Sequence, residues 1–142
     1  MSTTRMKSKT IATWLALGGG ALGAHRFYLY GWRDALAWMH WPIAIAGLLG
    51  LARAHSLGQD DRVAWALLPL LGLMLTQGML CGIVYGLRPN DRWDAQHNPG
   101  RTSPSTHWGT VAGVILCLML GAGFLMSTLA FCAQRYFELQ AS

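Results

Sequence analysis

The sequence predicts an all-α, polytopic integral membrane protein with four transmembrane helices, and three observations lead to this fold class. The 142 residues are 53% hydrophobic and 12% charged, whereas a soluble domain carries roughly 25% charged residues. The mean hydropathy is positive, at +0.30. The charged residues also cluster, and the uncharged intervals between the clusters approach or exceed the length that crosses a bilayer.

The four helices are predicted over about residues 10–30, 34–53, 62–87 and 108–133. A helix rises about 1.5 Å per residue, so about 20 residues cross a hydrocarbon core of about 30 Å. The uncharged stretches 63–87 and 108–133 meet this length, and 35–52 lies near its lower limit. The chain therefore divides into a basic tail (1–9), a helical hairpin (10–53), a loop with the third helix (54–87), a polar loop (88–107), and the fourth helix with a polar C-terminal stub (108–142).

The first apolar stretch leaves two interpretations open. Residues 10–24 are short for a span and follow three basic residues, which is also typical of a cleavable signal peptide. Ala21 and Gly23 supply the small residues that such a cleavage site uses. Alternatively, the helix continues through residues 27–29 and reaches about the length that a span needs.

The stretch "GALGAHRFYLYGW" (residues 20–32) is predicted to form an elbow between the first two helices. An arginine costs about 2.5–3.5 kcal/mol at the bilayer centre but much less at the interface, where it can reach lipid phosphate. Tyrosine and tryptophan favour the same layer. We therefore expect Arg26 and Arg33 to bind lipid phosphates, while Phe27, Tyr28 and Trp32 set the depth of the elbow. The elbow set is His25, Arg26, Phe27, Tyr28, Trp32 and Arg33.

The order of these residues resembles a known family. Lys7-Ser8-Lys9 precede a glycine-rich helix with Gly20 and Gly23, and Ala24-His25-Arg26-Phe27-Tyr28-Leu29 is followed by Trp32-Arg33-Asp34. This string is similar to the elbow of the TM2 domain family, G-x-x-G-x-H/D-R-F-Y-L-G, over about residues 7–51. Two departures exist: Tyr30 replaces the last glycine, and no acidic residue lies between Asp34 and Asp60. The resemblance implies two uncleaved membrane helices joined by the elbow, and it brings no enzymatic activity.

Small residues predict where helices pack. Five glycines recur at four-residue spacing in the third and fourth helices: Gly78, Gly82 and Gly86, then Gly109 and Gly113. Faces of this kind let two membrane helices approach closely. The sequence leaves open whether the contacting helix belongs to this chain or to a second copy of it.

His40 and Gln77 are the polar side chains that raise a functional question inside the spans. An ionisable residue within a membrane is a functional candidate, but His40 precedes Pro42 and could simply bond a carbonyl that the proline leaves free. The three cysteines lie in apolar runs without a CxxC pair, which favours small buried hydrophobic residues. We find no catalytic motif and no spacing for a metal or haem, so we expect no enzyme, no cofactor and no metal.

The predicted function is a small, non-enzymatic scaffold or accessory subunit that acts through helix–helix contacts. Its expected partners are membrane lipids, and either other membrane proteins or a second copy; no nucleic-acid partner is expected. The alternative is a small transporter or channel component with a polar path near His40 and Gln77. We expect a bacterial cytoplasmic membrane. Four spans divide Lys and Arg almost evenly, 6 against 5, between the two sides, so the three basic residues ahead of the first span decide the orientation and place both termini in the cytoplasm.

Overall fold

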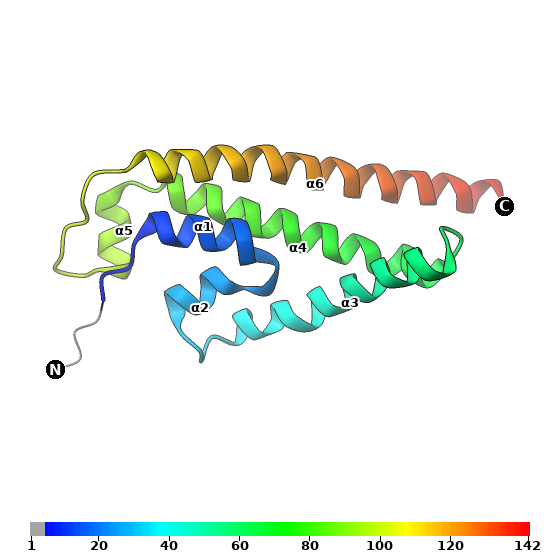
Figure 1. Cartoon of the computed structure of the whole chain (residues 1–142), viewed down its shortest axis with the longest axis horizontal. Helices are drawn as coiled ribbons and strands as arrows, with labels where there is room; N and C mark the ends of the chain where they lie inside the picture. Colours follow the sequence, from blue (N-terminus) through cyan, green and yellow to red (C-terminus); the bar gives the residue numbers. More distant parts are fainter. Residues whose placement is uncertain (1–4) are drawn as a thin grey trace.

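The computed structural model describes residues 5–142, and this part of the chain is helical with no strand (Figure 1). The helices are α1 (Lys9–Gly19), the 3₁₀ turn η1 (Gly20–Leu22), α2 (Ala24–Tyr30), α3 (Ala35–Leu57), α4 (Arg62–Leu87), α5 (Asn90–His97) and α6 (Trp108–Ala141). Three of them, α3, α4 and α6, are long and apolar enough to cross a membrane. The all-α membrane class is confirmed, but a fourth span is not.

The single helix predicted over residues 10–30 is wrong, because this segment breaks at its glycines and doubles back. Gly23 adopts φ +75°, a left-handed conformation that favours glycine and ends a helix. The backbone N–H of Ser8 then donates to the Tyr28 hydroxyl at 2.9 Å, and the Lys7 ammonium donates to the Leu29 carbonyl. These contacts bring the end of α2 back beside the start of α1. Residues 9–30 therefore form a short hairpin, which enters and leaves at the same end of the molecule.

α4 is the centre of the structure, with α6 along one side and α3 along the other, and the short helix α1 packs on both α4 and α6 (Figure 1). At one end Trp14 donates to the Gly109 carbonyl at 3.0 Å, and at the other the Arg135 guanidinium lies 4.6 Å from the Trp65 ring. We call the first the N-terminal end; it holds residues 5–9, 26–34 and 88–107. We call the second the C-terminal end; it holds residues 53–62 and 134–142.

The two termini of the described chain lie at these opposite ends (Figure 1). The expected arrangement, with both termini on one side, depended on four spans. Only three helices of the described chain are long and apolar enough to cross a membrane, and the hairpin returns to its own end of the molecule. The structure therefore does not support a shared side for the two termini.

The polar segment after α4 is more ordered than the predicted loop. Residues 90–97 form α5, in which Trp93 is fully buried and donates its indole N–H to the Lys7 carbonyl at 2.8 Å. Asp94 accepts from the Ser103 backbone N–H at 2.6 Å and from the Asn98 amide at 3.0 Å. The Ser103 hydroxyl also donates to Asp94. This bond first, and then the other two, hold the pKa of Asp94 below its usual value. The segment cannot bury enough apolar surface alone, but docking on the tail supplies the missing contact.

The last helix is also longer than predicted. α6 continues to Ala141, through the stretch that the sequence predicts to be a polar stub after residue 133. Arg135 and Glu138 lie one turn apart and form an ion pair at 2.5 Å, and Gln134 donates to Glu138 at 2.9 Å. Pairs at this spacing support a helix in which hydropathy alone shows no continuation.

Candidate functional site

The elbow between α2 and α3 forms around one ion pair. The Arg26 Nε atom donates to Asp34 Oδ2 at 2.7 Å, and Asp34 Oδ1 accepts the Leu36 backbone N–H at 3.2 Å, which caps α3. Arg26 first, and then the cap, lower the pKa of Asp34. The guanidinium also lies 5.0 Å from the Tyr30 ring centroid. Arg26 is thus partly buried and paired with Asp34, where it holds α2 against the start of α3.

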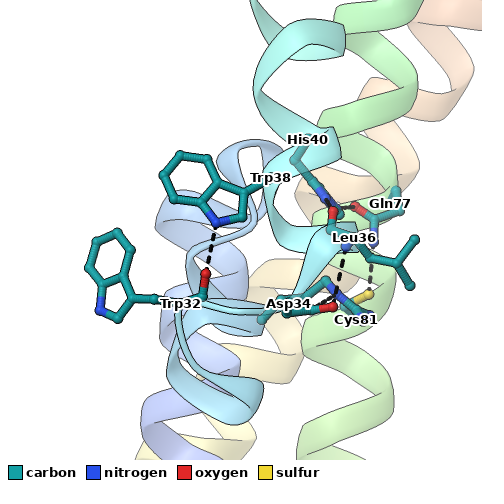
Figure 2. Close-up of polar contacts among 8 residues, drawn as sticks. Trp32, Asp34, Leu36, Trp38, His40, Gln77 and Cys81 are labelled. Atoms are coloured by element: carbon teal, nitrogen blue, oxygen red, sulfur yellow. Dashed lines mark hydrogen bonds and ion pairs between the residues drawn. The ribbon is translucent and has the colours of Figure 1, made fainter.

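Aromatic side chains cover the outside of this elbow (Figure 2). The Trp38 indole N–H donates to the Trp32 carbonyl at 2.8 Å. Phe27 packs against both rings, with centroids 5.1 Å from Trp32 and 5.2 Å from Trp38. Trp32 is 75% exposed, and Arg33 is exposed beside it. Of the two predicted phosphate-binding arginines, Arg33 is the one whose side chain faces outward.

A polar cluster lies beneath the elbow, between α2, α3 and α4. The His40 Nδ1–H donates to the Leu36 carbonyl at 2.6 Å, and His40 Nε2 lies 3.2 Å from Gln77 Oε1. The Gln77 amide nitrogen donates to Cys81 Sγ at 3.1 Å (Figure 2). His40 thus bonds a carbonyl of its own helix and a side chain of α4, so it joins α3 to α4 beneath the elbow.

His25 lies against this cluster and has no hydrogen bond. Its ring is fully buried, and neither nitrogen has a partner in the described part of the chain. The ring centroids are 6.0 Å from His40 and 5.7 Å from Tyr85. A buried polar group is nearly always hydrogen-bonded, so an unpaired one needs an explanation. His25 was predicted to lie at the headgroups, but the structure places it inside the protein.

A second elbow, between α3 and α4, was not predicted, and it repeats the first after 27 residues. Arg53 Nε donates to Asp61 Oδ2 at 2.7 Å, and Asp61 caps α4 through Val63 and Ala64. The Trp65 indole N–H donates to the Gln59 carbonyl at 2.6 Å. The identical pairs include Gly20 and Gly47, Gly23 and Gly50, Arg26 and Arg53, Gly31 and Gly58, Asp34 and Asp61, Ala37 and Ala64, Trp38 and Trp65, and Pro42 and Pro69.

The backbone repeats as well. Gly31 has φ +82° and ψ −176°, and Gly58 has φ +89° and ψ −179°, a conformation that strongly favours glycine. The two histidines are not repeated, because Ala52 and Leu67 occupy the positions that match His25 and His40. The second elbow therefore forms without histidine, so the elbow geometry does not account for these two residues. Comparing the sequence with itself at an offset of 27 would have found this signal.

The five glycines that were predicted to pack helices all face other segments of this same chain. A methyl group added at Gly78 would come within 2.7 Å of Gly20 Cα, so the apex of the α1–α2 hairpin touches the middle of α4. Gly82 faces Cys117, and Gly113 faces Thr13. The others are in similar places: Gly86 against Val114, and Gly109 near Thr10. The contacting helices are spans and hairpin segments of the same chain.

Charge is divided unequally between the two ends. The N-terminal end holds eight basic residues and three acidic ones, which leaves +5: Arg5, Lys7, Lys9, Arg26, Arg33, Arg88, Arg92 and Arg101, against Asp34, Asp91 and Asp94. The C-terminal end is neutral: Arg53, Arg62 and Arg135, against Asp60, Asp61 and Glu138. The formal net charge of the whole chain is +5, so one end carries all of it.

The residues that the structure describes contain no group of three or more histidine, cysteine or acidic side chains placed to hold a metal ion. Cys81, Cys117 and Cys132 are free thiols. Neither a curated protein nor a solved structure matches this chain. A family model does match, over residues 5–53, and it covers α1, α2, the first elbow and most of α3. The resemblance is confirmed: the N-terminal part of this chain carries a TM2 domain.

Proposed function

We propose that this small membrane protein is a non-enzymatic scaffold or accessory subunit that binds other membrane proteins through its spanning helices. The observation that carries this proposal is the open arrangement of the spans. α3 and α6 each pack on α4 but hardly on one another, so the three helices do not close into a bundle. Surface that a closed bundle would bury is left for lipid or for a partner helix.

The partner contact is placed on a groove between α4 and α6. The glycines near the N-terminal end are already used within the chain, so they are not available to a partner. Toward the C-terminal end, where α1 no longer covers α4 and α6, a groove of about 270 Å³ remains. Leu71, Gly72 and Leu75 line it from α4, and Phe124 and Ser127 line it from α6. Small and apolar residues of this kind are what membrane helices pack against.

Co-purification from native membranes tests this proposal. Ser127→Trp would fill the groove, whereas Met119→Trp, on an exposed part of α6 outside it, is the matched control. We expect the wild type and the control to retain the same partner after mild extraction, and the groove variant to lose it. A wild-type protein that comes out alone would contradict the proposal.

We also propose an orientation, with the N-terminal end in the cytoplasm and the C-terminus on the other side of the membrane. The hairpin changes the division of Lys and Arg from 6 against 5 to eight against three, and the basic side of a short-looped membrane protein faces the cytoplasm. This division supports the proposed orientation and revises the expectation for the C-terminus.

A second candidate function is transport along a polar path, and the cluster beneath the first elbow favours it. His25, His40, Gln77 and Cys81 lie together within the membrane region, and the second elbow shows that its geometry forms without the histidines. The double variant His40→Leu with Gln77→Leu separates the two functions. A transporter would lose activity, whereas a scaffold would keep its partner.

A further inference from the structure

The helix contact inside each elbow repeats, but its histidine does not. A methyl group added at Gly23 would come within 3.2 Å of His40 Cγ, and one added at Gly50 would come within 2.6 Å of Leu67 Cβ. These residues occupy matching positions in the two elbows. Leucine therefore makes the same contact in the second elbow, so this packing needs no titratable side chain.

His25 is harder to explain than His40. His40 bonds the Leu36 carbonyl and Gln77, whereas the ring of His25 is fully buried and neither of its nitrogens has a partner in the described part of the chain. A buried polar group without a hydrogen bond is destabilising. Ala52, at the matching position of the second elbow, avoids this cost. The first elbow thus contains a titratable ring that the elbow geometry does not require.

The surroundings of His25 favour its neutral form. From Thr10 to Gly19, α1 presents no titratable side chain to it. The nearest carboxylate, on Asp34, is already paired with Arg26 at 2.7 Å, so it gives an imidazolium little compensation. The titratable and charged groups around the ring are Arg26 on α2, Asp34 in the elbow, His40 on α3, and Cys81 and Tyr85 on α4. Only one of these groups carries a negative charge, and it does not bond to His25.

Proton binding by His25 is therefore coupled to the docking of the α1–α2 hairpin. α2 is not one of the three helices long enough to span a membrane. Burial first, and then the charges of His40 and Arg26, lowers the pKa of His25 from 6.5 to about 4 while the hairpin is docked. A ring that reaches water regains its ordinary pKa, so the released hairpin binds the proton more tightly. Docking is at its full strength above about pH 6.5 and weakens as the pH falls toward about 4.

We propose that His25 is a proton-binding site through which acid releases the α1–α2 hairpin from α3 and α4. The proton comes from water and binds one ring nitrogen, and the resulting imidazolium needs water or an acceptor that the docked hairpin does not provide. The proposal requires neither the groove for partner helices nor a transport path, so each can fail without the other.

Cys117 can report whether the hairpin is docked. It is fully buried, and Gly82 lies against both this thiol and α1: an added methyl group would come within 2.5 Å of Cys117 Sγ and 3.4 Å of Ala16 Cβ. Two single-thiol forms of the full chain are compared, one that keeps Cys117 and one that keeps Cys132, which is exposed on the same helix. The other cysteines are replaced by alanine.

The reaction of each thiol with dithiodipyridine is followed in a non-ionic detergent from about pH 7 to about pH 4.5. The ratio of the Cys117 rate to the Cys132 rate removes the pH dependence that belongs to thiol chemistry itself. Asp34 and Asp94 have lowered pKa values, so both stay ionised over this range and do not contribute to the change.

We expect the rate ratio to rise by about tenfold or more over this range when His25 is present. His25→Leu should keep the ratio low at every pH, and so should His25→Gln, which is polar but not titratable. His55→Leu makes the same change at an exposed histidine and should keep the rise.

Three results would overturn the proposal. The first is a ratio that does not change with pH when His25 is present. The second is a rise that persists in the His25 variants, because the proton would then bind elsewhere. The third is a ratio that is high at every pH in both His25 variants, because His25 would then only hold the hairpin in place.

Discussion

Asp60 and Asp61 are neighbours in the sequence with different surroundings, and they show how a single side chain holds an elbow. Asp61 pairs with Arg53 at 2.7 Å and caps α4 through the N–H groups of Val63 and Ala64. Asp60 is exposed. The two residues carry the same charge at adjacent positions. A difference in stability between their alanine variants therefore reports the cap and the ion pair of Asp61.

We expect Asp61→Ala to lower the midpoint of thermal unfolding in detergent by about 2–4 °C, since it removes the cap and leaves Arg53 without its carboxylate. Asp60→Ala should change the midpoint by less than about 1 °C. Circular dichroism at 222 nm would measure both. Similar shifts in the two variants would contradict the role given to Asp61.

Asp94 predicts a pH dependence of the segment after α5. Its hydrogen bonds hold its pKa below the ordinary value of 3.8. A carboxylate with a lowered pKa contributes its full stabilisation above the ordinary value, and the contribution is lost as the pH falls through the folded value. Amide hydrogen exchange of residues 98–103 should therefore accelerate below about pH 4 beyond the intrinsic change. Asp94→Asn should exchange faster at pH 7 and lose this added acid dependence.

The α1–α2 hairpin depends on a contact that only glycine permits. An added Cβ at Gly78 would meet the Gly20 backbone, which cannot move aside as a flexible side chain would. We expect Gly78→Ala to destabilise the fold by roughly 1–3 kcal/mol. Gly123→Ala is the control, because nothing lies within 4 Å of that site, and it should be neutral or stabilising by up to about 1 kcal/mol. Chemical unfolding in mixed micelles measures both, and equal effects would contradict the close approach.

The contact between α3 and α4 through His40 and Gln77 predicts a non-additive pair. His40→Leu leaves Gln77 without its partner and should cost about 1–3 kcal/mol. His40→Leu with Gln77→Leu replaces both polar groups, so it should be close to neutral. Leu67 occupies the position of His40 in the second elbow, so leucine suits the helix geometry. A double variant that is as unstable as the sum of the single ones would show that the pair does not interact.

The sequence predicted the long helices well and the short ones poorly, for a physical reason. α3 and α4 begin and end within a few residues of the predicted bounds, because charged residues interrupt the apolar runs there. Hydropathy cannot distinguish a helix of about 20 residues from two shorter ones that double back, so the turn at Gly23 was missed. In α5, Trp93 is buried and bonds to the tail, a contact distant in sequence that hydropathy does not reveal.

The polar cluster was predicted in part. His40 and Gln77 were predicted to line one polar path, and the packing of α3 on α4 brings these residues, 37 positions apart, within 3.2 Å of each other. Cys81 was interpreted as a small hydrophobic residue, and nothing in its neighbourhood indicated a hydrogen bond with Gln77. The interior position of His25 followed from the hairpin and could not be known without it. The sequence identified the polar residues themselves, but the contacts between them depend on the tertiary fold.

The whole molecule has one basic end and one neutral end, and this asymmetry depends on the hairpin. If residues 9–30 crossed the membrane once, Arg26 and Arg33 would lie on the side opposite the tail. Since the hairpin returns, the tail, the first elbow and residues 88–107 gather on one side with eight basic residues. A returning hairpin puts the tail on the same side as residues 88–107, whereas a single crossing by residues 9–30 puts it on the same side as the C-terminus. Labelling can therefore distinguish the two arrangements.

Three single cysteines, placed in a variant whose three native cysteines are replaced by alanine, decide between these arrangements. Met6→Cys marks the tail, Ser105→Cys marks the segment before α6, and Ser142→Cys marks the C-terminus. The hairpin puts the tail on the same side as residue 105, in the cytoplasm. An impermeant maleimide added to intact cells should therefore label the C-terminal site only. After lysis the other two should also react. Labelling of the tail together with the C-terminus, and not of residue 105, would require four spans, and the orientation argued from charge would then be wrong.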